Sequence, residues 1–174
     1  MFYLLLFEHR YKECCDTLDK LISLTDDREL QVACHTLKAD IESSLKHGTS
    51  EVLTSYLHAL ELSPGSLYAY FQGMTHLIRQ GAWQTIFAVS NAFADASRDK
   101  QMSCCALLLA GSVSNDLLSD ILGSKSAYEQ ALKYQPNDVL PLELILENIA
   151  DDLTKGQRTG HHSPAMDTAG NQRF

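Results

Sequence analysis

The sequence predicts an all-α fold of antiparallel helix pairs stacked side by side, and three observations lead to it. One tyrosine, alanine and proline pattern occurs twice with the same internal spacing, as Tyr56, Ala59 and Pro64 and as Tyr128, Ala131 and Pro136. The two sets lie 72 residues apart, or two units of 34 residues plus four, which is typical of an internal repeat. Two-residue alternation of apolar and polar side chains is never sustained, so strands are not expected. With 174 residues, 45% of them hydrophobic, the chain is long enough for one domain with a core.

The first expected element is a partial unit over residues 1–30. Its opening segment, MFYLLLF, has a short apolar run without a preceding cation, so it is a poor signal peptide and is too short to span a bilayer. We expect the remnant of a first helix there, followed by a second helix in RYKECCDTLDKLISLTDD. A start inside a repeat is typical of a fragment, an alternative start or an isoform, and a complete chain stays equally open.

The next unit, about residues 31–65, ends in a helix whose apolar face combines Tyr56, Ala59 and Leu60. Ala59 is small, which indicates that a neighbouring helix approaches closely at this point. Pro64 lacks a backbone donor and disfavours helix at the residue before it, so the helix should end there.

The middle unit, about residues 66–99, begins with the helix LYAYFQGMTHLIRQ. We expect Gly73 at a point of close helix approach and Gly81 in the turn before AWQTIFAVSNAFADA. The repeated pattern is degenerate in this unit, because its aromatic, alanine and proline positions hold Ser90, Phe93 and Arg98.

The last unit, about residues 100–137, carries the second copy of the pattern, and its four surplus residues fit a longer first helix or loop around residues 115–121. A closing helix is expected over residues 138–153. Its predicted inner face would cover the last unit while acidic residues face water, with Leu142, Ile145 and Ile149 inside and Glu143, Glu147 and Asp151 outside. Residues 154–174 have almost no large apolar side chains, so we expect a disordered tail.

At SYLHALELSPGS and AYEQALKYQPND the chain resembles the tetratricopeptide repeat family, whose second helix carries a small residue, an aromatic, an alanine and a terminal proline. The resemblance covers roughly residues 1–149 and implies a short right-handed solenoid. It also implies that the first helix of each pair lines a concave groove, in which a peptide or helix of a partner protein binds.

By this resemblance, the first helices supply the groove candidates, which are Leu37, Ile41, Tyr68, Phe71, Thr75, Arg79, Leu109 and Val113, with Ser44 and Asp116 beside them. Tyr68 and Phe71 would be aromatic anchors. The alternative is that the apolar members of this set only complete the core. Some family members clamp acidic chaperone tails with lysine and asparagine. The matching places here hold other residues, namely Leu37, Ile41, Phe71 and Thr75, so no such clamp is expected.

Catalytic, cofactor and metal sites are not indicated. The chain has no glycine-rich phosphate loop, no GxSxG turn and no HExxH pair. Four of the five cysteines form two adjacent pairs, and neighbours on a helix diverge by about 100°, which suits packing better than zinc binding. An odd number of cysteines favours a reducing compartment, the cytoplasm, with the nucleus as the alternative.

The formal net charge of −8 and a pI near 5.2 disfavour nucleic acid and anionic membranes as partners. A protein partner remains. The sequence therefore predicts a non-catalytic interaction scaffold or adaptor, not an enzyme, working within a larger assembly. The alternatives are a regulatory or frame domain of an enzyme, and an incomplete isoform without independent function.

Overall fold

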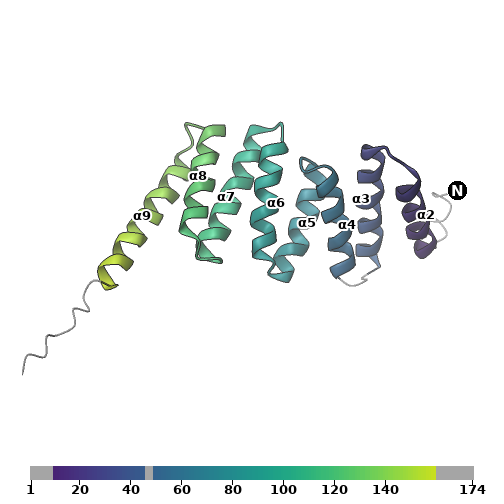
Figure 1. Ribbon diagram of the computed structural model, residues 1–174, viewed down its shortest axis with the longest axis horizontal. Coiled ribbons are helices and arrows are strands. Elements are labelled where there is room, and N and C mark those ends of the chain that lie inside the picture. Colours follow the sequence, from purple (N-terminus) through teal and green to yellow (C-terminus); the bar gives the residue numbers. More distant parts are fainter. Residues whose placement is uncertain (1–9, 46–48, 160–174) are drawn as a thin grey trace, which may run out of the picture.

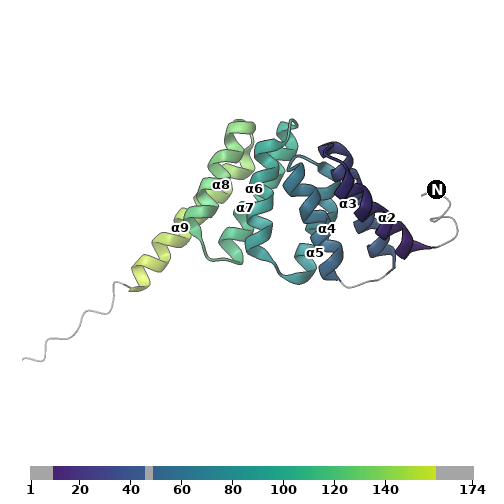
Figure 2. The same ribbon diagram turned by 45° about the vertical axis from the view of Figure 1, so that its right-hand side comes forward.

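The computed structural model describes residues 10–45 and 49–159, and this part of the chain is all-α without any strand. Its eight helices are α2 (Tyr11–Leu24), α3 (Arg28–Ser44), α4 (Thr49–Leu62), α5 (Leu67–Gln80), α6 (Trp83–Ala96), α7 (Lys100–Asp116), α8 (Ile121–Tyr134) and α9 (Val139–Thr159). The helices lie side by side in chain order, with α2 at one end of the array and α9 at the other (Figures 1 and 2). Each helix packs mainly against its neighbours in sequence, which confirms the predicted all-α class with consecutive packing.

The helix bounds repeat with an offset of 72 residues. Adding 72 to the bounds of α2, α3 and α4 gives those of α6, α7 and α8, and adding 72 to Leu67, where α5 begins, gives Val139, where α9 begins. A block of four helices therefore occurs twice. The offset first seen in the tyrosine, alanine and proline pattern thus extends to every helix start.

The starts of α3 and α7 show why the offset holds locally. Each helix follows an aspartate cap, Asp27 or Asp99. The Oδ1 atom accepts hydrogen bonds from two backbone N–H groups of the first turn, at 2.9 and 3.3 Å for Asp27 and at 2.9 and 3.2 Å for Asp99. The hydroxyl two residues earlier, on Thr25 or Ser97, accepts from the aspartate's own N–H at 3.1 or 3.2 Å.

The repeated tyrosines occupy matching places in the core. Tyr56 and Tyr128 are both fully buried, and each hydroxyl meets a side chain 16 residues earlier in the chain. Tyr56 donates to Asp40 Oδ1 at 2.5 Å, and the hydroxyls of Tyr128 and Ser112 lie 3.3 Å apart. Helices α4 and α8 both end two residues before a proline, as the sequence predicts.

The middle pair, α5 and α6, fills its core differently. The position that holds alanine in α4 and α8 holds Phe93 in α6. The Phe93 ring stacks on the ring of Tyr70 from α5, with centroids 4.1 Å apart. Ser90 stands where α4 and α8 have tyrosine, and its hydroxyl lies 3.0 Å from the Tyr70 hydroxyl. The aromatic ring is therefore supplied by the first helix. Gly81 lies in the predicted turn with φ of 65°, the left-handed conformation that glycine adopts without strain.

The close helix approach lies at a glycine other than the predicted one. A Cβ on Gly73 would meet Leu60 Cδ1 and Tyr56 Cβ at 3.6 Å, which is ordinary van der Waals contact. A Cβ on Gly111 of α7 would lie 2.1 Å from Cε1 of Tyr128. The expectation for Gly73 is therefore corrected, because a Cβ fits between Gly73 and α4, whereas at Gly111 the Tyr128 ring of α8 lies directly against the backbone of α7.

The closing helix is rotated relative to the prediction. Its buried residues are Pro141 and Asn148, whose Nδ2 donates to Ser124 Oγ at 2.8 Å. Ile145 is half-buried as expected, but Leu142 is exposed and does not cover α8. The side chain of Ile149 lies outside the described part.

Helix α9 also continues beyond residue 153, the expected end, to Thr159. Six residues of the expected tail are therefore helical. Extending an existing helix is much easier than starting one, so the helix continues through this stretch although it contains Gly156. The rest of the expected tail, residues 160–174, lies outside the described residues.

Candidate protein-binding groove

A largely apolar groove lies between α5 and α7, the first helices of two neighbouring pairs. Its cavity has a volume of about 300 Å³. The walls come from one face of each helix, with Phe71, Met74, Thr75 and Ile78 on α5 and Met102, Cys105, Ala106 and Leu109 on α7, and Tyr70 and Phe93 complete the lining. Three of the predicted site residues, Phe71, Thr75 and Leu109, are thus brought together.

Helical spacing explains which side chains reach this groove. Phe71, Thr75 and Ile78 follow one another at intervals of four and three residues, so they lie on one face of α5. Phe71 and Ile78 are each about half exposed. The Thr75 hydroxyl donates to the backbone carbonyl of Phe71 at 3.1 Å, so its proton is directed back into the helix. The accessible surface of this wall is therefore mainly apolar.

Tyr68 lies on the same helix but points to α3 and not into the cavity. Its hydroxyl is 3.0 and 3.1 Å from the two carboxylate oxygens of Asp40, the same group that accepts from Tyr56. Burial and the neighbouring Asp40 carboxylate raise the pKa of Tyr56, so this phenol stays protonated and donates. Half of the Tyr68 side chain remains exposed. Asp40 was missed by sequence reasoning, since its only signal is a place 16 residues before Tyr56.

Other predicted groove residues lie elsewhere. Ile41 and Val113 are buried, and Ile41 packs with Cys14 and Leu18 of α2. Leu37 is half-buried against the same cluster. Ile41 and Val113 are corrected to core positions, because the faces of α3 and α7 that carry them meet neighbouring helices, while Leu37 lies at the edge of the α2–α3 cluster. Arg79 is exposed in the last turn of α5.

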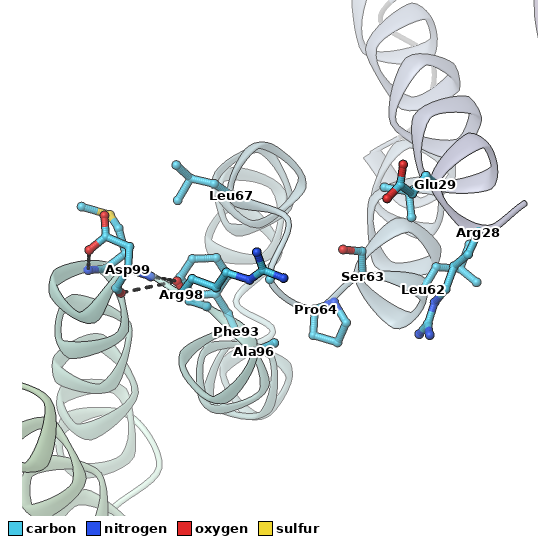
Figure 3. Close-up of a pocket in the computed structure, with 14 residues that line it drawn as sticks. Arg28, Glu29, Leu62, Ser63, Pro64, Leu67, Phe93, Ala96, Arg98 and Asp99 are labelled. Atoms are coloured by element: carbon cyan, nitrogen blue, oxygen red, sulfur yellow. Dashed lines mark hydrogen bonds between the residues drawn. The ribbon is translucent and has the colours of Figure 1, made fainter.

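A second and larger cavity, of about 750 Å³, lies where α3, α5 and α7 begin and α4 and α6 end. Figure 3 shows Arg98 directed toward Pro64, with Arg28 on the far side of the cavity. The Asp99 carboxylate in its wall already caps α7. Sequence reasoning did not identify this cavity, because its lining comes from three separate stretches of sequence, mostly turns and helix ends.

Four of the five thiols, those of Cys14, Cys15, Cys34 and Cys104, are poor nucleophiles. None of the five cysteines forms a disulfide. Burial raises the pKa of Cys15 to about 11, and it also raises the pKa of Cys14, Cys34 and Cys104. Cys105, in the groove, is exposed. Among the described residues, no group of three histidine, cysteine or acidic side chains is placed to hold a metal ion.

The fold and the groove define a class, an all-α protein of consecutively packed helix pairs with an apolar cleft between two first helices. No family model matches the chain. No curated protein matches it either. Within residues 10–45 and 49–159, none of the helices combines the length and the apolar character needed to cross a membrane.

Proposed function

We propose that this protein is a non-catalytic scaffold or adaptor of the tetratricopeptide-like kind, and that it binds a segment of a partner protein between α5 and α7. The observation that carries the proposal is the cavity of about 300 Å³ beside the half-exposed Phe71 and Ile78. Large apolar side chains at the rim of an open cavity are typical of protein interfaces.

Burial of these side chains supplies the binding free energy. Covering the remaining exposed half of Phe71 and of Ile78 contributes roughly 1 kcal/mol each, which is half of the roughly 1.5–3 kcal/mol for burying a whole side chain of this size. A partner side chain that enters the cavity adds its own burial. The partner best suited to this groove is therefore a helix or extended peptide with a large apolar anchor, such as leucine, methionine or phenylalanine.

The proposed binding needs no catalytic acid or base. The groove lining contains one thiol, Cys105, and no carboxylate, histidine or lysine. A general acid and base would need such groups within hydrogen-bond reach of a substrate. The five free thiols favour a reducing compartment, so we infer the cytoplasm or the nucleus as the place of action.

Affinity capture from cell extract tests the proposal. The wild-type chain is compared with a Phe71→Ala, Ile78→Ala double variant and with a Leu122→Ala control, which removes an exposed leucine from α8 outside the groove. The main associated protein should be lost with the double variant and kept with the control. Equal capture by all three chains would refute the groove as the binding site.

Alkylation of Cys105 gives a second readout on the same complexes. Because this thiol is exposed and lines the groove, a bound partner should slow its reaction with iodoacetamide. An unchanged rate in the captured complex would place the partner elsewhere on the protein.

A further inference from the structure

The two ends of the helix array match an interface inside it. By the 72-residue offset, α9 corresponds to α5 and α2 corresponds to α6. Helices α5 and α6 pack against each other, whereas among the described residues α9 packs mainly on α8 and α2 mainly on α3. Within the described part, the first helix of the array is therefore of the α6 kind and the last is of the α5 kind.

The exposed leucines at the ends are the counterparts of buried residues in the interior. Tyr70 of α5 is 4% exposed, and its counterpart on α9, Leu142, is 47% exposed. Met74 is 4% exposed and its counterpart Leu146 is 66% exposed. On the other side of the interface, Phe93 of α6 is 1% exposed and its counterpart on α2, Leu21, is 40% exposed.

We propose that copies of this protein associate head to tail, with α9 of one copy packed against α2 of the next as α5 packs against α6. In the interior, Tyr70 and Phe93 stack with ring centroids 4.1 Å apart. At the proposed junction their counterparts, Leu142 and Leu21, meet in the same place. Both are apolar, and the contact removes both from water.

Charges beside the junction are compatible with it. Glu61 of α4 and Ala88 of α6 line one shared interior cleft. Their counterparts are Lys133 of α8 and Asp16 of α2, two exposed residues of opposite charge. The net charge of −8 opposes self-association through general repulsion, so moderate salt favours the junction.

The geometry makes the association open-ended. A head-to-tail contact uses a different surface on each copy, so each added copy again presents a free α9 end. Residues 1–9 align with residues 73–81, which form the second half of α5 and the turn residue after it, and they lie outside the described part. The junction therefore rests on residues 139–144 of α9, which include Leu142 and whose counterparts on α5 precede residue 73.

Sedimentation velocity of the full chain tests the proposal with three variants. Leu142→Glu places a charge on the α9 end, and Leu21→Glu places one on the α2 end. Leu122→Glu is the control, since Leu122 is an exposed leucine of α8 whose counterpart, Ser50, is exposed. All three side chains are exposed, and circular dichroism checks that each variant is folded.

The wild type and the control should form dimers and longer species as concentration rises, and each end variant alone should stay monomeric. An equal mixture of the two end variants has one intact α9 end and one intact α2 end, so it should form a heterodimer and nothing longer. A wild type that is monomeric at every concentration would overturn the proposal. A mixture that stays monomeric while the wild type associates would overturn it as well, in favour of a symmetric contact.

Discussion

Replacing Gly111 by alanine should destabilise the protein, although alanine favours helices. The new Cβ would lie 2.1, 2.5 and 2.7 Å from three ring carbons of Tyr128. Carbon atoms in contact sit about 3.5–4.0 Å apart, so the ring has to move by more than about 1 Å. Tyr128 is 1% exposed and its hydroxyl is paired with that of Ser112, which leaves little room for that movement.

Two opposing terms set the magnitude. Overpacking a core costs roughly 1–3 kcal/mol, and the change from glycine to alanine inside a helix returns roughly 1 kcal/mol. The counterpart of Gly111 in the first block is Ala39, which packs with Tyr56, so a helix pair of this kind can accommodate a Cβ when its backbone is set for one. We therefore expect a net destabilisation of about 1 kcal/mol.

Gly73→Ala is the matched control, because its new Cβ meets only ordinary contacts at 3.6 Å. This variant should be stabilised by about 1 kcal/mol, the helix-propensity term alone. The two variants should thus differ by about 2 kcal/mol in free energy of unfolding, or by roughly 4–8 °C in melting temperature. Urea and thermal unfolding followed by circular dichroism measure both quantities. A Gly111→Ala chain as stable as the Gly73→Ala chain would refute the packing described for α7 and α8.

The remaining predictions concern caps, acid and thiols. Asp27→Ala and Asp99→Ala should each lower the free energy of unfolding by about 1 kcal/mol, and unequal losses in urea melts would contradict the equivalence of the two caps. Burial, followed by the Arg79 charge, lowers the pKa of His76, so His76 stabilises the fold when neutral and this stability is lost as pH falls below about 6.5. His76→Asn, which introduces the residue found at the aligned position 148, should reduce the loss of stability between about pH 7.5 and 5.5 in urea titrations, and an unchanged pH dependence would refute the role of His76. Brief alkylation of the native chain, read by mass spectrometry, should modify Cys105 first, because it is the exposed cysteine; earlier modification of Cys14 or Cys34 would contradict their burial.

Two helix ends and one turn of this fold could be predicted from individual residues. Pro64, Pro136 and Gly81 act through their own backbone chemistry, which does not depend on distant parts of the chain. The helix ends and the turn at these residues agree with expectation. The repeated tyrosines also indicated the 72-residue offset, because each fills the same place between two helices.

The rotation of each helix about its axis could not be predicted in the same way. An apolar stripe indicates a buried face, but α9 has apolar residues on two faces, and packing on α8 decides that Pro141 and Asn148 are inside while Leu142 is not. Ile41 and Val113 were placed in the groove for the same reason, since periodicity does not distinguish the groove side of a first helix from its core side. The Tyr70–Phe93 stack could not be predicted, because the middle unit departs from the repeated pattern and the two rings come from different helices.

Site-specific photo-crosslinking tests the central claim, partner binding between α5 and α7, most directly. A photoreactive amino acid at position 78 faces the groove, and the same amino acid at position 122 of α8 provides an equally exposed control outside it. Irradiation in cells should join position 78 to one discrete partner protein and leave position 122 without that product. The same product from both positions, or none from position 78, would contradict the account.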